Sequence, residues 1–167
     1  MELTFPKKPY RTHGGADVPH HKNTAQMETV VMPCPSQVTI PMQQHVGAPC
    51  KPLVKKGDTV LVGQKIADSE AYVSAPIHAS ISGTVSGITK VMLPGGQFTE
   101  AVVIDSDGEM KPFPDLRPPE VNSPEELVKA VRESGLVGLG GAGFPAHVKL
   151  TVPKDKHLDT LIVNVAE

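Results

Sequence analysis

The pattern of apolar and polar positions divides the chain into two kinds of segment. Between residues 30 and 110, short runs rich in Val, Ile, Thr and Met alternate with turn residues, which predicts β structure. The expected strands cover residues 38–42, 52–54, 59–62, 79–81, 83–85, 91–93 and 100–104. Hairpin turns are expected at Lys56–Asp58 and Ser82–Gly83, because both combine glycine with polar residues.

Beyond residue 120 the apolar residues follow the spacing of an α-helix. Ser123-Pro-Glu-Glu126 is a capping box with proline at the first helical position, and Gly135 is a suitable stop. The positions between them form one apolar face: Leu127, Val128, Ala130 and Val131. Asp159-Thr-Leu-Ile-Val-Asn-Val-Ala-Glu167 is then predicted to be a buried parallel strand.

A proline-rich stretch separates these two regions. Residues 111–120 contain four prolines, which favour an extended or polyproline conformation and exclude a helix. We therefore expect an extended basic arm at 1–29, a β domain at 30–110, a linker at 111–120, and the start of an α/β domain at 121–167. The fold class is mainly β.

The β region contains a weak internal repeat. Ala48–Pro49 is followed by Gly57 and Val60, and Ala75–Pro76 by Gly83 and Val85. Two such halves are expected to fold together as a small flattened barrel. The runs 54–60, 63–66 and 69–71 resemble biotinyl and lipoyl carrier domains, the barrel-sandwich hybrid. Carriers have a modifiable lysine at the next hairpin tip, which here reads Tyr72-Val-Ser-Ala-Pro76. The resemblance thus implies a binding or docking module without carrier chemistry.

Composition and charge narrow the function classes. A length of 167 residues suits one ordinary domain or two small ones. A net charge of −2 gives no electrostatic footprint for nucleic acid. No apolar run approaches the roughly 20 residues that span a bilayer, and no signal peptide is recognised. A cytoplasmic chain with no direct membrane span is expected.

The reactive side chains form no recognisable catalytic or metal-binding set. Fifteen residues separate Cys34 from Cys50, a spacing that suits neither a redox pair nor a metal site, so two buried or inert thiols are expected. We interpret His45 and His78 as structural histidines at the seam between the two domains. Asp68 and Glu70 are interpreted as turn and surface carboxylates.

Glycine dominates the segment Gly135–Phe144, where five glycines occur. Consecutive N–H groups in such a loop can cradle a phosphate. A dinucleotide-binding loop leaves a strand, however, and this one leaves a helix. The alternative is a glycine-rich connection that binds nothing.

The loop and its flanks resemble the flavin loop of NADH-oxidising subunits of respiratory complex I. The similarity lies in Gly138-Leu-Gly-Gly-Ala-Gly-Phe-Pro145, Lys149 and Val163–Glu167, with Leu139 at a position where the complex I loop has arginine. The resemblance implies that FMN is held here, with NADH stacking on the flavin. The implied cofactor-binding residues are Gly138, Gly140, Gly141, Gly143, Phe144, Lys149, Asn164 and Glu167.

Taken together, the motifs resemble the C subunit of the Rnf complex, an ion-translocating ferredoxin:NAD oxidoreductase. The matching runs are 40–49, 55–58, 63–66, 74–80 and 138–144. The resemblance implies a cytoplasmic subunit, peripheral on the inner face of the cell membrane, that works with other subunits and, through the complex, with ferredoxin. It implies electron exchange between NAD(H), FMN and iron–sulfur clusters.

In that family the cluster cysteines lie downstream of position 167, so the chain resembles an N-terminal portion. We expect no tightly bound cofactor and no activity in these 167 residues alone. Two alternatives remain open: a soluble NADH-linked flavoprotein reductase similar to cobalamin reductase, and a non-enzymatic docking module. The expected fold is a barrel-sandwich hybrid followed by the start of an α/β flavin-binding domain.

Overall fold

The computed structural model describes residues 14, 19, 21–153, 155–160 and 162. The chain forms two compact units, Met1–Met32 and Pro33–Glu167. The described part of the first unit contains a turn at residues 23–26 and is exposed. All helices and strands of the described chain belong to the second unit.

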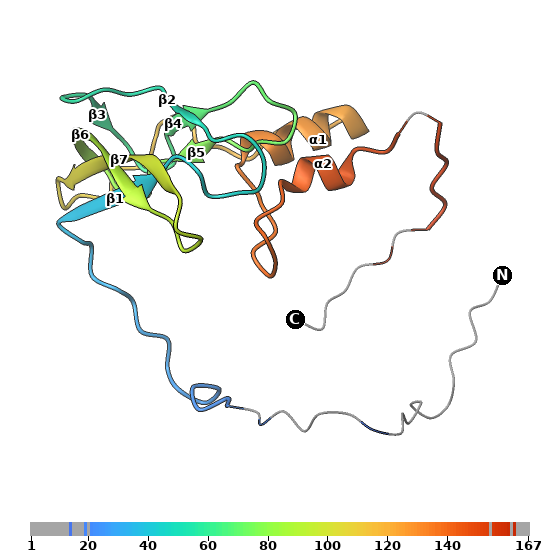
Figure 1. Cartoon of the computed structure of the whole chain (residues 1–167), viewed down its shortest axis with the longest axis horizontal. Coiled ribbons are helices and arrows are strands. Elements are labelled where there is room, and N and C mark those ends of the chain that lie inside the picture. The colour runs from blue at the N-terminus through green and yellow to red at the C-terminus, as the bar shows by residue number, and fades with distance from the viewer. Residues whose placement is uncertain (1–13, 15–18, 20, 154, 161, 163–167) are drawn as a thin grey trace. The chain divides into compact units, whose positions relative to one another are not determined.

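Two antiparallel sheets form the β domain (Figure 1). The four-stranded sheet has the order β1 (Gln37–Pro41), β7 (Phe98–Ser106), β6 (Gly83–Met92) and β3 (Thr59–Val60). The three-stranded sheet has the order β2 (Lys51–Pro52), β4 (Lys65–Asp68) and β5 (Ile77–His78). This arrangement confirms the mainly β, barrel-sandwich class.

The core lies between the two sheets. It consists of aliphatic side chains that alternate with exposed positions, as in Gly83–Val85 of β6. Both sheets contribute: the buried members include Ile40, Val60, Ile66, Ile77, Val85, Val102 and Ile104. Each fully buried side chain of this size stabilises the fold by about 1.5–3 kcal/mol.

Several strands lie where the alternation predicts them. β1, β3 and β7 overlap the expected runs 38–42, 59–62 and 100–104. The strand expected at 79–81 is wrong, because the adjacent Ile77–His78 pairs with β4 instead. The runs 83–85 and 91–93 lie in or next to one ten-residue strand, β6.

Strand β4 was not expected at all. Its two central residues, Ile66 and Ala67, are both buried, and the pairing with β5 shifts register between Lys65 and Ala67. The four residues Lys-Ile-Ala-Asp contain only one β-branched side chain, so the composition that marks the other strands in the sequence is absent here.

The turn at Lys56–Gly57 is confirmed, but it joins β2 and β3, which belong to different sheets, and is not a hairpin. The turn expected at Ser82–Gly83 is wrong. Gly83 begins β6, where a Cβ atom would lie 1.9 Å from the Asp105 carbonyl oxygen, so glycine there permits close strand contact. The β6–β7 hairpin turns at residues 93–97.

The two halves of the internal repeat pair with each other. Val60 of β3 lies opposite Gly83 of β6. Gly57 N–H donates to the Val85 carbonyl at 2.8 Å, and Val85 N–H donates to the Asp58 carbonyl at 2.9 Å. The glycine of each half thus lies against the valine of the other half, at the seam between them.

The proline-rich stretch contains no helix and begins against the β domain. Val62 N–H donates to the Lys111 carbonyl at 2.9 Å, and Phe113 N–H donates back to the Val62 carbonyl at 2.9 Å. A Cβ at Gly63 would lie 2.9 Å from Leu116. The first half of residues 111–120 therefore packs on the barrel.

Helix α1 (Pro124–Glu133) confirms the capping prediction. Ser123 Oγ accepts the Glu126 N–H at 3.1 Å, and the Glu126 carboxylate accepts the Asn122 N–H at 2.6 Å. Gly135, with φ +71°, follows the C-cap. A short helix not expected from sequence, α2 (Ala146–Leu150), lies beside α1 (Figure 1). No helix within the described ranges is long and apolar enough to cross a membrane.

The parallel strand expected at 159–167 is wrong for the residues that can be judged. Asp159, Thr160 and Ile162 lie outside any strand and are exposed, Ile162 by 88%. A parallel strand needs a neighbour to complete its hydrogen bonds, and the described part of the chain places none beside this segment. The other residues of that run, Leu161 and 163–167, lie outside the described residues.

Candidate functional site

The glycine loop connects α1 to α2 as a closed, exposed turn. A bridge between Val137 and Pro145 closes its base. Inside it, Gly138 N–H donates to the Phe144 carbonyl at 3.0 Å and Gly143 N–H donates to the Gly138 carbonyl at 3.2 Å. The N–H groups of residues 139–142 have no acceptor among the described residues. Within the described chain, these four consecutive donors therefore remain available to water or to a ligand.

Two glycines of the loop have different roles. Gly143 has φ +69°, and a Cβ there would lie 3.1 Å from the Gln44 carbonyl oxygen. The Gly143 carbonyl also accepts the Val46 N–H at 3.2 Å, which ties the loop to the barrel. Gly141 has no positive φ, and a Cβ there would meet nothing within 4 Å. Gly143 is therefore needed by the fold, whereas Gly141 leaves open space.

Lys149 lies on α2, and its side chain returns toward the loop. Its Nζ atom is 3.0 Å from the position that a Cβ at Gly138 would take. Lys149 is exposed and forms no ion pair within the described part of the chain. The loop and one cation are thus brought together as expected. Asn164 and Glu167 lie outside the described residues.

The loop forms one wall of an open cleft of about 930 Å³. The opposite wall belongs to the barrel, which contributes the loop 43–47 and the β6–β7 turn. Ligand pockets commonly have volumes of about 300–1,000 Å³. The cleft is lined by Gln43–Gly47, Leu93–Gly95, Gln97, Val137–Leu139 and Gly141–Gly143. Leu139 is 90% exposed at its rim.

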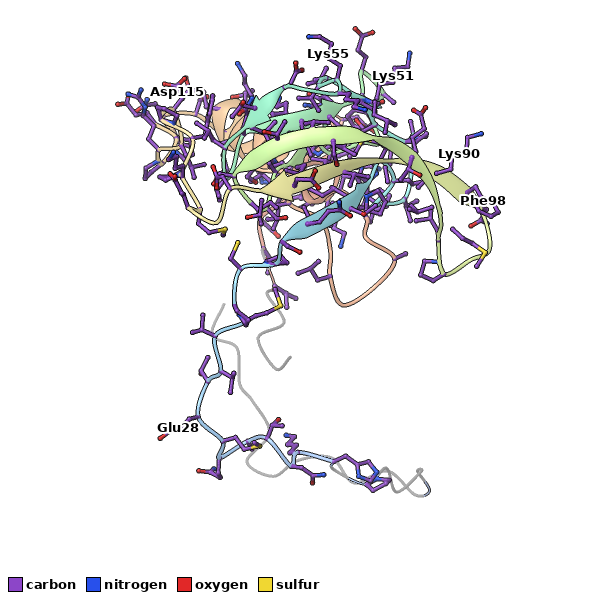
Figure 2. All side chains as sticks on the ribbon, turned by 90° about the vertical axis from the view of Figure 1, so that its left-hand side faces the viewer. Glu28, Lys51, Lys55, Lys90, Phe98 and Asp115 are labelled. Atoms are coloured by element: carbon purple, nitrogen blue, oxygen red, sulfur yellow. The ribbon has the colours of Figure 1, made fainter. Side chains whose placement is uncertain are left out.

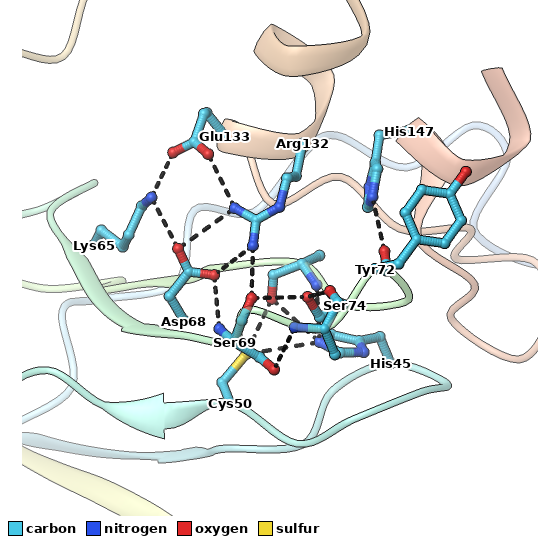
Figure 3. Close-up of polar contacts among 12 residues, drawn as sticks. His45, Cys50, Lys65, Asp68, Ser69, Tyr72, Ser74, Arg132, Glu133 and His147 are labelled. Atoms are coloured by element: carbon cyan, nitrogen blue, oxygen red, sulfur yellow. Dashed lines mark hydrogen bonds and ion pairs between the residues drawn. The ribbon is translucent and has the colours of Figure 1, made fainter. Parts of the chain in front are cut away.

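The tip that resembles a carrier hairpin contacts α2. His147 is buried and its Nε2–H donates to the Tyr72 carbonyl at 3.1 Å, with the two rings edge to face at 6.1 Å (Figure 3). Ala48 N–H donates to the Val73 carbonyl at 3.1 Å. The tip is thus bonded within the chain, where a carrier would present its modified lysine.

A buried histidine–cysteine pair holds the other end of the same hairpin. Ala75 N–H donates to His45 Nε2 at 3.1 Å, and the Cys50 thiol donates to the Ala75 carbonyl at 3.1 Å. His45 Nδ1–H therefore donates to the Val46 carbonyl at 3.1 Å. Burial, and then the Asp68 carboxylate, raise the pKa of Cys50 and keep it a neutral thiol. This pair is structural, as expected for His45 and Cys50.

Four charged side chains join α1 to the barrel, and we call them the four-charge cluster: Lys65, Asp68, Arg132 and Glu133 (Figure 3). Arg132 donates to Asp68 at 2.8 Å and to the Ser69 carbonyl at 2.8 Å. Lys65 Nζ lies 3.1 Å from Asp68 and contacts Glu133.

Burial alone would raise the pKa of Asp68. Hydrogen bonds from Arg132, the Ser69 N–H and Lys65 outweigh burial and lower that pKa to about 2. Burial likewise opposes ionisation of Glu133, but the contacts with Lys65 and Arg132 lower its pKa. Asp68 is therefore a structural ion-pair residue, and its interpretation as a turn or surface carboxylate is wrong.

The remaining sequence-based expectations have mixed outcomes. His45 and His78 both line a small cavity of about 140 Å³ between the barrel and Gly135, as expected for the seam. Burial and then the Lys65 charge lower the pKa of His78. Of the two thiols expected to be buried or inert, Cys50 is buried, whereas Cys34 is exposed and its Sγ lies 3.3 Å from Ser106 Oγ.

Comparison with known proteins agrees with this architecture. Residues 10–109 match the family described as RnfC Barrel sandwich hybrid domain, which covers more than half of the chain. The chain belongs to the RnfC family. Residues 131–167 match the Nuo51 FMN-binding domain, and both the glycine loop and Lys149 lie inside that match.

Curated relatives are the C subunits of ion-translocating complexes. Over 161 residues the chain is 42% identical to that of the Na(+)-translocating ferredoxin:NAD(+) oxidoreductase complex of Acetobacterium woodii, covering 92% of this chain and 36% of that protein. It is 46% identical over 149 residues to that of the proton-translocating ferredoxin:NAD(+) oxidoreductase complex of Clostridium ljungdahlii, covering 87% and 33%. The equivalent protein of the Rhodobacter capsulatus ion-translocating oxidoreductase complex is 40% identical over 171 residues, covering 99% and 33%. The chain spans about a third of these RnfC relatives.

Several residues of the site are not predicted by any pattern in the sequence. Tyr72 and His147 meet only because the hairpin tip folds onto α2. Arg132 reads as an ordinary cation near a helix C-terminus, which is a favourable position in any helix. Gln43 and Gln97 reach the cleft from loops of the barrel. Each of these contacts depends on tertiary folding, so no local pattern marks it.

Proposed function

We propose that this chain is the N-terminal portion of a peripheral electron-transfer subunit of a membrane-bound ferredoxin:NAD oxidoreductase. Its glycine loop would bind FMN, and the complete subunit would exchange electrons between NAD(H), FMN and iron–sulfur clusters. Its partners would be other subunits of the complex on the cytoplasmic face of the membrane, with ferredoxin reached through them. The ion-translocating names of the RnfC relatives favour this function over a soluble reductase.

One observation carries the proposal: the N–H groups of residues 139–142 have no acceptor among the described residues, in a loop that lines a cleft and lies beside Lys149. Backbone N–H donors bind phosphate through short, charge-assisted hydrogen bonds. Lys149 Nζ adds a positive charge on the same side. The phosphate of FMN matches this donor set, and the cleft volume of about 930 Å³ suits a ligand of that size.

The division of work follows from the chemistry of the groups. Bound FMN would supply hydride and single-electron chemistry, which belongs to the cofactor. The chain would supply orientation: the amides of residues 139–142 would fix the phosphate, Lys149 would add charge, and Gly141 would leave room. Asn164 and Glu167 are proposed to hydrogen-bond the flavin or its hydroxyl groups.

The test compares glycine variants of the full-length subunit. Gly141→Ala should lose FMN, because a methyl group would occupy space that the structure leaves open. The structure gives no strain cost for this change, so folding should be retained. Gly87→Ala is the matched control, since Gly87 lies on β6, has no positive φ and also has nothing within 4 Å of a Cβ.

Lys149→Ala should weaken FMN binding less than Gly141→Ala, because the charge of an exposed lysine is screened by salt and the backbone donors remain. Flavin fluorescence after dialysis measures retained FMN, and circular dichroism checks folding. Equal FMN content in the wild type, Gly87→Ala and Gly141→Ala would mean that the glycines serve only the turn.

A further inference from the structure

The two walls of the cleft differ in the kind of group they present. The glycine-loop wall offers backbone and aliphatic groups only, from residues 137–139 and 141–143. Every side chain of the cleft with a hydrogen-bonding group comes from the barrel: Gln43, Gln44, His45 and Gln97. Among the described residues that line this cleft, side-chain hydrogen bonds to a ligand can therefore come only from the β domain.

Two of these four side chains are already engaged. Both ring nitrogens of His45 have backbone partners, and Gln44 Nε2 donates to the Pro41 carbonyl at 3.2 Å. The amides of Gln43 and Gln97 have no hydrogen-bond partner among the described residues. Gln43 is half-buried and Gln97 is exposed, with its Oε1 2.6 Å from a Cβ built on Gly95. These two amides are available to a ligand.

The barrel loops are also held in place relative to the glycine loop. Val46 N–H donates to the Gly143 carbonyl at 3.2 Å, so the loop 43–47 and the glycine loop form one connected structure. The β6–β7 hairpin, whose outer end carries Lys90 and Phe98 in Figure 2, turns through the cleft-lining residues Leu93–Gly95 and Gln97. In Figure 1 this turn and the glycine loop project from the same side of the barrel.

We propose that the barrel is half of the flavin site, with Gln43 and Gln97 hydrogen-bonding the polar edge of the isoalloxazine ring. That edge alternates two carbonyl acceptors with one N–H donor, and a glutamine amide supplies both a donor and an acceptor. Leu93 and Val46 add apolar surface beside the ring. The proposal rests on the assignment of FMN to this cleft, and it gives the β domain a role in cofactor recognition.

The contributions of the two walls to binding can be distinguished by comparing FMN with riboflavin, which lacks the phosphate. In the full-length subunit stripped of flavin, Gln43→Leu and Gln97→Leu should each weaken binding of both ligands by a similar factor. The expected factor is about two- to tenfold, the range of one neutral hydrogen bond. Lys149→Ala should weaken FMN and leave riboflavin unchanged. Titration of flavin fluorescence gives the dissociation constants.

Gln37→Leu is the matched control, because Gln37 lies on β1 outside the cleft and bonds Asp105. It should leave both affinities unchanged, and thermal unfolding should show that each variant is folded. If Gly141→Ala lowers FMN affinity but both cleft glutamine variants bind like the wild type, the barrel proposal is overturned while the FMN assignment stands. If Gly141→Ala and Lys149→Ala also have no effect, the FMN assignment fails and the barrel proposal fails with it.

Discussion

The interactions that stabilise the barrel differ from those that attach the helical segment 121–153 to it. The barrel has a continuous aliphatic core, and Val60, Ile66, Val102 and Ile104 are all completely buried. Helix α1 has no buried residue, and Leu127 on its apolar face is 48% exposed. The segment is attached instead by the four-charge cluster, by His147 on the hairpin tip, and by the Val46–Gly143 hydrogen bond.

This difference separates stability from binding. Apolar burial stabilises the barrel strongly and involves no charges that salt could screen or pH could titrate. Hydrogen bonds and partly exposed ion pairs contribute less and can be weakened one at a time. The glycine loop therefore sits on the segment that costs less to open, which is where binding loops are commonly found.

The largest effect is expected from the core. Ile104→Ala removes a completely buried side chain from the centre of β7 and should cost about 2–5 kcal/mol of unfolding free energy. Urea denaturation followed by circular dichroism measures the loss. The exposed Ile88 on β6 is the control, and Ile88→Ala should cost far less. Equal losses for the two variants would contradict a core between the sheets.

The next effect is a pH dependence from Asp68. Its pKa is about 2 in the folded chain against 3.8 for the free group, so the folded state favours the charged form. The contribution, about 2 kcal/mol at most, is present above pH about 4 and is lost as the pH falls toward about 2. Asp68→Asn should be less stable than the wild type at pH 6, and the difference should shrink by pH 2.5. A difference in unfolding free energy that stays the same at both pH values would contradict the stabilising role of the Asp68 charge.

A smaller effect, about 1 kcal/mol, is expected when the Arg132 side chain loses its charge. Arg132→Met deletes the contacts with Asp68 and the Ser69 carbonyl but keeps much of the apolar stem. Limited proteolysis should then cut the glycine loop faster while the barrel core stays resistant. Arg117→Met is the control, because Arg117 is 75% exposed and its pair with Asp115 is on the surface. Identical cleavage rates for the two variants would show that the four-charge cluster does not attach the helical segment to the barrel.

The sequence predicts the elements whose signals are local. Ser123, Pro124 and Gly135 define α1 because capping chemistry acts within one turn. Strands β1, β3 and β7 follow from runs rich in Val, Ile and Thr. Strand β4, Lys-Ile-Ala-Asp, has a single β-branched residue and is not recognised, and α2 is not recognised because its five residues are too few to show a helical period.

Only one wall of the candidate site can be predicted from the sequence. Gly138–Gly143 and Lys149 are recognisable because they lie close together in the sequence and match a known glycine-loop pattern. The other wall includes Gln43 and Gln97, which lie 54 positions apart (97 − 43) and line the same cleft only through the barrel topology. The ion pair of Asp68 is not predictable from the sequence for a similar reason, since its partner Arg132 comes from a different element.

The most direct test of the central claim is hydrogen–deuterium exchange of the full-length subunit with and without FMN. If the glycine-loop amides cradle the cofactor phosphate, FMN should slow exchange at residues 139–142, whose N–H groups have no acceptor in the described chain. Riboflavin should not slow it, because it has no phosphate. Amides of β7, already bonded within the sheet, should exchange at the same rate in both states. Unchanged exchange at residues 139–142 with FMN demonstrably bound would contradict the account.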